Sequence, residues 1–559
     1  MQTTSFPATY VDLQVGAPLL EPEGNMQIKM KTRKVYIDGT VLNSGVTYTV
    51  TRAWGQVAVG NNWASDSDGV LPTPGKVSLT NAAGLLEGVG RGVVLDGDSL
   101  SARNWNELAI TSASRTGTTA TILATGFGAV AGSTVVVNGY SDERWNGPKT
   151  ALLAPAGTFL FKIDPNADGV PTAAVNPAGT TARSPTVITA TQRRCEGSYV
   201  WCEATSGINY GLVFNCARGG REISQINADF AYTVGAYPGE LIIFEGGTND
   251  ANRGIATSVS SAALEDYIVK CLAQGSLLIL TTVPPFGAAA NTVAKAGAVI
   301  ALNAEIRRLA GVYGLPVADR YTALIDPAGA NGVGLAVNYD SDGIHLSGAG
   351  AKAVAAVLQP VLATYQGGMP IAIPQSTGDT VGVLSASNNL LDGFFAGTGG
   401  SATGTAVGSV ATNWALVGTT AAFAGSKGAV SVGASQIVDL VGAAAGNFTL
   451  TGPTVHASMV VGGVYEFVGI MKLNTVSAAI RTSLTLQVNI GGTTLEIRAL
   501  SGLSATTPLP GGSYSMVFRS EPWTASATVL NCQPRAQIVL VSATTGTVEF
   551  YQWAIRRIA

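Results

Sequence analysis

The 559-residue chain has little charge and no excess of either sign: 12% of its residues are charged, with 32 Lys and Arg against 35 Asp and Glu. Proteins that bind nucleic acid usually carry a basic excess, so we expect no nucleic-acid partner. The sequence has no run of about 18 uninterrupted apolar residues, so we expect no membrane span. Hydrophobic residues nevertheless make up 46% of the chain, which excludes a disordered protein.

Cysteine and histidine are also scarce. The five cysteines form neither a disulfide framework nor a zinc pattern, and we expect no metal or other cofactor. Residues 1–7 lack the basic start of a Sec-type signal peptide, so we expect no such leader. The two histidines, His345 and His456, matter because a general base at neutral pH is most often histidine. His456 lies in an alternating segment, where a structural or exposed role is expected.

Residues 91–365 carry the pattern of an α/β domain, after a β-rich N-terminal region over 1–90 with short alternating runs. Continuous apolar runs, which suit strands covered on both faces, alternate with helical periods and predict a doubly wound parallel sheet. In the second helix, Ile300, Leu302, Ile306 and Leu309 are expected to share the buried face. The apolar runs lie at 93–95, 212–214, 241–244 and 277–280, and the helical periods at 258–273 and 294–310.

Two further segments are β-rich, so the chain is predicted to be multidomain. Residues 111–190 have no helical period, and we expect a β-sandwich inserted in a loop of the α/β domain, resembling Ig-like modules of phage tail proteins. A linker over 366–384 precedes residues 385–559, which alternate as in a β-sandwich or jelly roll. The opening segment of that region, 389–395, resembles the first strand of carbohydrate-binding jelly rolls.

Candidate catalytic residues lie at two places: one follows the first predicted strand of the α/β domain, and the others precede its last helix. Ser99 comes directly after the run 93–95, and Gly97 would permit the tight turn that exposes it. His345 precedes a helix that Ser347 could cap, and Asp342 is three residues earlier, where a carboxylate could orient the imidazole. Nucleophile, base and carboxylate are therefore all available.

The sequence Gly-Asp-Ser-Leu at 97–100 resembles the first block of the SGNH (GDSL) hydrolases, and the other three blocks follow in family order. Asn215 and Gly220 supply the second block, a glycine five residues after an asparagine that ends a strand. Residues 247–250, Gly-Thr-Asn-Asp, match the third block, and 342–345, Asp-Gly-Ile-His, match the fourth. The resemblance covers about residues 90–110 and 190–365.

This resemblance implies a serine esterase. Ser99 would attack an ester carbonyl, His345 would take its proton, and Asp342 would hold the imidazole. The backbone N–H groups of Ser99 and Gly220 and the side-chain amide of Asn249 would form the oxyanion hole. Two features depart from the family. Arg and Glu follow Gly220 where many members carry a small hydroxyl residue, and the gap between Ser99 and Gly220 is unusually long, which the inserted module explains.

Some neighbouring residues have alternative interpretations. Asp98 and Asp250 are expected to fix turns rather than react, and Asp340 competes with Asp342 although its spacing to His345 is wrong for the family. A second group could touch a sugar or play a plainer part: Arg218 and Arg221 beside the site could contact an acidic sugar or be solvated, and Trp105 and Trp201 could stack on sugar rings or pack in the core.

Taken as a whole, the chain resembles phage tail spikes or fibres that carry an SGNH domain. The resemblance implies an O-acetyl or similar ester on bacterial capsule or lipopolysaccharide as substrate, other tail proteins as partners, and a homo-oligomer, commonly a trimer. It also implies a virion protein that acts outside the cell at the host surface, with 1–90 attached to the tail and 385–559 binding glycan or supporting oligomerisation. Two alternatives remain open: a non-catalytic receptor-binding tail protein, and a secreted bacterial carbohydrate esterase.

Overall fold

The computed structural model describes most of residues 92–558 and five short strands before residue 92. The chain divides into two compact units. The first comprises Met1–Ala102, Asn209–Ala336 and Ala353–Met369, and the second comprises Arg103–Ile208, Val337–Lys352 and Pro370–Ala559. After residue 92, the description has gaps at 125–133, 139, 141–142, 153–157, 163–185, 238, 367, 372, 374–394, 442–444, 458, 503–507, 526 and 559.

The described part of the N-terminal region consists of short antiparallel strands. Three of them form one sheet in the order β1 (Met30–Lys31), β2 (Lys34–Ile37) and β3 (Thr40–Val41). The other two, β4 (Thr47–Val50) and β5 (Gly75–Ser78), pair with each other. All five strands lie within residues 1–90, the region predicted to be β-rich.

A five-stranded parallel sheet forms the centre of the first unit, as the continuous apolar runs predict. In spatial order its strands are β15 (Leu212–Asn215), β6 (Val93–Gly97), β16 (Leu241–Glu245), β17 (Leu277–Thr281) and β18 (Val317–Ala318). Every residue of β6, β16 and β17 is buried, as expected for strands covered on both faces. The doubly wound α/β class is confirmed for this unit.

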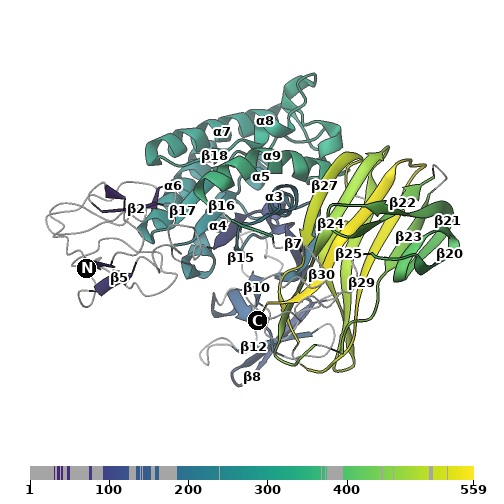
Figure 1. Ribbon diagram of the computed structural model, residues 1–559. Helices are drawn as coiled ribbons and strands as arrows, with labels where there is room; N and C mark the ends of the chain where they lie inside the picture. Colours follow the sequence, from purple (N-terminus) through teal and green to yellow (C-terminus); the bar gives the residue numbers. More distant parts are fainter. Residues whose placement is uncertain are drawn as a thin grey trace. The chain divides into compact units, whose positions relative to one another are not determined.

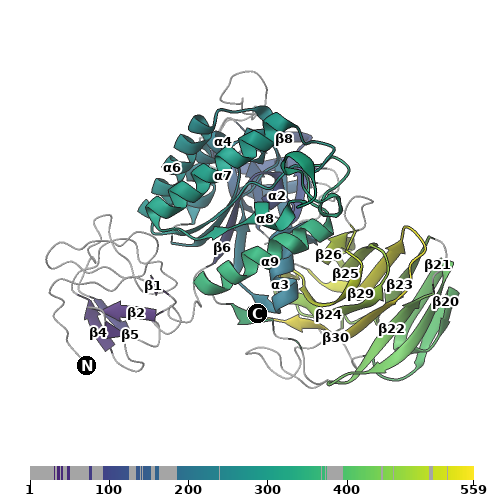
Figure 2. The ribbon, with the colours of Figure 1, turned by 90° about the horizontal axis from the view of Figure 1, so that it is seen from above.

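Helices connect these strands, and two long ones, α6 (Thr257–Ala273) and α7 (Val293–Tyr313), lie side by side (Figure 1, Figure 2). The first ends where the predicted helical period 258–273 ends, close to Gly275, which is in the left-handed region at a φ of +77°. The other helices are α2 (Ser99–Ala102), α3 (Ser198–Ser206), α4 (Ile223–Ala228), α5 (Thr248–Arg253), α8 (Arg320–Leu324) and α9 (Gly348–Tyr365), with 3-10 turns at Glu143–Trp145, Phe230–Tyr232, Val234–Ala236, Ala330–Gly332 and Ala336–Asn338.

The predicted buried face of α7 is wrong at one position. Leu302, Ile306 and Leu309 are buried, but Ile300 is 56% exposed. Val299 takes its place, because steps of three and four residues from Leu302 and Ile306 lead back to 299 rather than 300.

No helix in the part of the chain that the structure describes has the length and apolar character needed to cross a membrane.

The second unit is built on one large mixed sheet of 15 strands, whose C-terminal strands run side by side in Figure 1. Its path runs β11-β10-β13-β26-β25-β29-β23-β21-β22-β30-β24-β27, with β7, β20 and β28 paired to it at the side. The bounds are β7 (Trp105–Ala109), β10 (Thr134–Asn138), β11 (Gly147–Thr150), β13 (Thr186–Arg194), β20 (Gly399–Gly408), β21 (Val410–Ala429), β22 (Ala434–Leu440), β23 (Gly446–Thr451), β24 (Val464–Val476), β25 (Ile480–Ile490), β26 (Thr493–Gly502), β27 (Gly512–Arg519), β28 (Trp523–Thr524), β29 (Val529–Leu540) and β30 (Thr547–Arg557).

The predicted insertion contributes to this sheet and to a second, smaller one. Strands β8 (Ser112–Thr116), β9 (Thr119–Leu123) and β12 (Thr158–Lys162) form a three-stranded antiparallel sheet. One apolar cluster holds side chains from both sheets, among them Ile122, Val135 and Phe161. Strand β13 continues past the predicted insertion, and its last residues pair in parallel with β26 of the C-terminal region. The assignments as an Ig-like β-sandwich and a jelly roll stay predictions.

Two short strands, β14 (Ile208–Asn209) and β19 (Met369–Pro370), complete the described elements. Strand β19 and a few residues beside it lie within the predicted linker, while the rest of the linker and the segment 389–394 lie outside the described residues.

Candidate active site

The turn that carries Ser99 follows β6, the strand between β15 and β16 in the parallel sheet. Gly97 ends β6, and Ser99, which is partly exposed, begins α2. A β carbon at Gly97 would lie 2.3 Å from the carbonyl oxygen of Glu245 in β16, so only glycine allows this approach. The backbone N–H of Asp98 donates to the same carbonyl at 3.1 Å. The Ser99 turn is therefore held tightly against the end of β16.

Asp98 fixes this turn, as the sequence indicates. One carboxylate oxygen accepts the N–H of Leu100 at 3.0 Å, and the other accepts the N–H of Thr248, in the loop of the third block, at 3.2 Å. Burial raises the pKa of Asp98 to about 6, in spite of these hydrogen bonds and of the nearby Arg320. Asp98 thus connects the first and third blocks instead of reacting.

The second block is attached to α2 through Asn215. Its side-chain amide donates to the carbonyl of Ser101 at 3.0 Å and accepts the N–H of Ala217 at 3.1 Å. The loop continues to Gly220, which is exposed and has a left-handed φ of +78°. Because Asn215 ends β15, its position in the sheet sets the path of the loop that leads to Gly220.

The third block begins α5. Asn249 is half-buried, and its amide donates to the carbonyl of Arg221 at 3.0 Å. An amide has two N–H donors, and this bond uses one of them. Asp250 accepts the N–H of Ile223 at 3.0 Å and the hydroxyl of Ser260 at 2.6 Å, so it has a structural role, as expected, but at the first turns of α4 and α6.

The fourth block brings Asp342 and His345 together within the second unit. The Nδ1 atom of His345 lies 2.5 Å from Oδ2 of Asp342, whose other oxygen accepts the backbone N–H of Ile344 and His345 at 2.9 and 3.0 Å. Partial burial alone would raise the pKa of Asp342, but these hydrogen bonds outweigh it and lower the pKa. A carboxylate fixed at Nδ1 orients the ring and leaves Nε2 as the nitrogen for proton transfer.

The start of α9 follows this block directly. Ser347 caps the helix as predicted, accepting the N–H of Gly350 at 3.2 Å.

Asp340, the alternative carboxylate, has a different partner. Its Oδ2 lies 2.9 Å from a guanidinium nitrogen of Arg103, and only 5% of its side chain is exposed. Burial raises the pKa of Asp340, although Arg103 opposes the shift. Asp342, and not Asp340, is therefore the carboxylate on the imidazole. Arg103 is the residue directly after α2 in the chain. Its ion pair with Asp340 therefore attaches the backbone that leaves α2 to the loop that carries Asp342.

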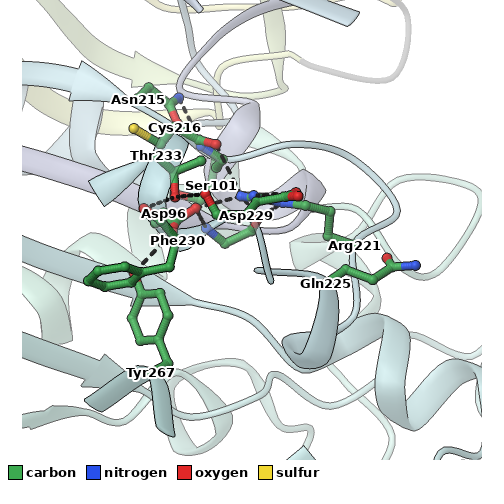
Figure 3. Close-up of polar contacts among 12 residues, drawn as sticks. Asp96, Ser101, Asn215, Cys216, Arg221, Gln225, Asp229, Phe230, Thr233 and Tyr267 are labelled. Carbon is green, nitrogen blue, oxygen red and sulfur yellow. Dashed lines mark hydrogen bonds and ion pairs between the residues drawn. The ribbon is translucent and has the colours of Figure 1, made fainter. Parts of the chain in front are cut away.

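Both interpretations of Arg218 and Arg221 were wrong, because both side chains are buried and neither is solvated nor open to a sugar. Arg221 pairs with Asp96, which Tyr267 also contacts (Figure 3). No motif marks Asp96 or Tyr267, and the only available signal was an acidic residue at the end of a buried strand.

The structure decides between the two interpretations of Trp201 but not those of Trp105. Trp201 is fully buried and its indole donates to the carbonyl of Cys195 at 2.7 Å, so it packs in the core. The side chain of Trp105 lies outside the described residues. His456 is half-buried in the C-terminal region.

The described ranges contain no group of three or more His, Cys, Asp or Glu side chains that could hold a metal ion.

Residues 188–353 match the GDSL-like Lipase/Acylhydrolase family. The match contains Gly220, Asn249, Asp342 and His345, and Ser99 precedes it. No curated protein matches the chain.

Solved structures similar to the chain include three from different organisms. A GDSL-like lipase from Bacteroides thetaiotaomicron is 22% identical with a TM-score of 0.24, covering 27% of this chain and 74% of the other. A lipase/acylhydrolase from Enterococcus faecalis is 19% identical with a TM-score of 0.23, covering 28% and 78%. A carbohydrate esterase family 3 protein from Talaromyces cellulolyticus is 19% identical with a TM-score of 0.22, covering 27% and 70%.

Proposed function

We propose that this chain is a serine esterase with Ser99 as nucleophile, His345 as general base and Asp342 as the carboxylate that orients His345. The observation that carries the proposal is the hydrogen bonding around Ser99. Asp98 connects the Ser99 turn to the loop before Asn249, and Asn215 connects α2 to the loop before Gly220. The segments of three family blocks are thereby held to one another at the carboxyl ends of adjacent parallel strands, where open α/β sheets bind ligands.

The family match supports the assignment of residues that lie outside it. The match begins at residue 188, after Ser99, yet β6 is paired with β15 and β16, which both lie inside the matched range. Ser99 therefore follows a strand that lies between two strands of the matched domain. The predicted insertion, 111–190, makes up most of the long segment between Ser99 and residue 188, and β6 pairs with β15 and β16 in spite of it.

In the proposed reaction, the Ser99 hydroxyl attacks the ester carbonyl as Nε2 of His345 takes its proton. The tetrahedral oxyanion would accept hydrogen bonds from the backbone N–H of Ser99 and Gly220 and from the Asn249 amide. Collapse of the intermediate breaks the ester bond, and the departing alkoxide receives the proton from His345. Water, deprotonated by His345, then releases the carboxylic acid from Ser99. Asp342 stabilises the imidazolium in both steps.

We further propose O-acetyl groups of bacterial surface polysaccharide as the substrate, within a phage tail protein that acts at the host surface. The resemblance of the sequence to SGNH-bearing tail spikes supports this context, as do the β-rich segments on both sides of the hydrolase blocks. In this proposal residues 1–90 attach to other tail proteins, 385–559 bind glycan or support a homo-oligomer, and 111–190 form the inserted module.

Acetate release from purified capsule or lipopolysaccharide tests the proposal. The wild-type chain and Ser112→Ala, which alters an exposed serine on β8, are expected to release acetate, and Ser99→Ala is expected to release none. Equal release by Ser99→Ala would remove Ser99 from the mechanism. Hydrolysis of a small acetyl ester without acetate release from any polysaccharide would retain the esterase and reject the substrate. Glycan binding without any hydrolysis would favour the receptor-binding alternative.

A further inference from the structure

We propose that Arg221 is a positioning residue of the oxyanion hole. It would hold in place the three segments that carry the donors, namely those of Ser99, Gly220 and Asn249. The proposal rests on the esterase function proposed above. It goes further because Arg221 belongs to none of the four blocks and reaches no substrate atom: 1% of its side chain is exposed.

The guanidinium of Arg221 binds two backbone carbonyls in the two loops that carry backbone donors (Figure 3). Its Nη2 donates to the carbonyl of Gly97 at 2.8 Å and to that of Cys216 at 3.0 Å, and Nε approaches the Gly97 carbonyl at 3.2 Å. Gly97 lies two residues before Ser99, and Cys216 lies four residues before Gly220. One planar group therefore sets the separation of the two loops.

The backbone of Arg221 serves the third donor. Its carbonyl accepts one N–H of the Asn249 amide at 3.0 Å. A side-chain amide can rotate, and this bond fixes its plane so that the second N–H has a defined direction. Arg221 also directly follows Gly220 in the chain. A single residue thus contacts or adjoins the segment of every donor.

Arg221 is itself held by the buried carboxyl group of Asp96, whose pKa burial raises although Arg221 and the Tyr267 hydrogen bond oppose the shift. Its Nη2 lies 2.5 Å from Oδ1 of Asp96, which is fully buried, and the Tyr267 hydroxyl donates to the other oxygen of Asp96 at 3.0 Å. Burial alone would lower the pKa of Arg221, but Asp96 and Asp229 raise it, so the guanidinium stays charged. A charged, planar guanidinium that is buried and hydrogen-bonded on several sides can adopt only a narrow range of positions.

The position of oxyanion donors decides how much they stabilise the transition state, since the charge appears only there. Loosening Arg221 is therefore expected to lower the rate of the chemical step without weakening substrate binding. A purely structural role would instead show as lost stability, with kinetic constants of the folded fraction unchanged.

The test uses Arg221→Lys in the full chain, with p-nitrophenyl acetate as substrate. Lysine keeps a positive charge for Asp96 but ends one bond before the position of Nη2, and it lacks the planar fork. We expect kcat to fall about 10- to 100-fold with KM within about twofold of wild type. A folded Arg221→Lys with wild-type kcat would overturn the proposal.

Tyr267→Phe is the matched control. It removes a hydrogen bond from the same buried Asp96, but the Tyr267 hydroxyl binds that carboxylate and not the Gly97 or Cys216 carbonyl that Arg221 binds. We expect a lower unfolding temperature and a kcat within about twofold of wild type. If Tyr267→Phe lowers kcat as much as Arg221→Lys does, the effect is general destabilisation and the proposal is wrong.

A third variant keeps the test decisive if Arg221→Lys does not fold. Asp96→Asn retains Arg221 and replaces its charged partner with a neutral acceptor, and we expect kcat to fall several-fold with KM unchanged. A folded Asp96→Asn with wild-type kcat would then contradict the proposal. Ser99→Ala separates the two levels of inference: if wild type hydrolyses the ester and Ser99→Ala does not, the esterase function holds whatever the Arg221 variants show.

Discussion

Asp98 offers a quantitative test of the packing beneath the proposed active site, because its carboxyl is buried and still bonded at both oxygens. Burial raises its pKa from 3.8 to about 6. At about 1.4 kcal/mol per pKa unit, the ionised carboxylate lowers the free energy of unfolding at pH 7 by roughly 3 kcal/mol relative to an unperturbed aspartate. Between pH 4 and 6 the folded state holds a proton that the unfolded state has released, so stability falls as the pH rises through this window.

Asp98→Asn removes this ionisation. We expect the variant and the wild type to unfold with similar free energies near pH 4, and the variant to be more stable at pH 7 by up to about 3 kcal/mol. Its kcat is expected to fall, because asparagine has one acceptor oxygen for the N–H groups of Leu100 and Thr248 and must lose one of the two bonds. Greater stability with lower activity is the signature of a strained functional turn.

The measurement is urea unfolding at several pH values between 4 and 8, followed by tryptophan fluorescence. The quantity of interest is the difference between Asp98→Asn and wild type, because all other titrating groups are common to both chains. A difference that does not change between pH 4 and 7 would refute the account of Asp98. If Asp98→Asn became less stable relative to wild type as the pH rises, the pH dependence of this difference would have the opposite sign, which would refute the account more strongly.

Three further predictions follow from the site. Asn249→Ala is expected to lower kcat about 10²- to 10³-fold with little change in KM, measured with a small acetyl ester, and a large KM change alone would contradict its place in the oxyanion hole. Asp342→Asn is expected to lower kcat about 10⁴-fold and Asp340→Asn less than tenfold, and the reverse order would exchange their roles. In Gly348→Val a new β carbon would lie 2.4 Å from the carbonyl oxygen of Pro508, so we expect a lower unfolding temperature. We also expect weaker activity, because α9 begins beside the Asp342 loop. An unchanged unfolding temperature and unchanged activity would show that this contact is unimportant.

The sequence was most informative where local pattern decides the structure. Continuous apolar runs marked four strands of the parallel sheet, and each lies within the observed strand. The fifth strand, β18, was missed because two residues are too short for a pattern. The pairing of β13 with β26 was also missed, since a parallel contact between Gln192 and Arg498 leaves no local signal.

For the site, the motif spacing correctly paired Asp342 with His345, and Asp98 and Asp250 have structural roles as expected. It failed at Arg221, because arginine is almost always exposed unless it is paired, and the partner Asp96 is distant in sequence. The ion pair between Arg103 and Asp340 was not predicted for the same reason. Charge pairs that cross the fold depend on its three-dimensional arrangement, which a motif in one segment cannot contain.

Covalent labelling with a fluorophosphonate, located by peptide mass spectrometry, tests the proposed nucleophile and base most directly. We expect one adduct, on the Ser99 hydroxyl, and a labelling rate that falls by orders of magnitude in His345→Ala. An adduct on another residue, or labelling of Ser99 that is equally fast without His345, would contradict the proposal that Ser99 and His345 act as nucleophile and base.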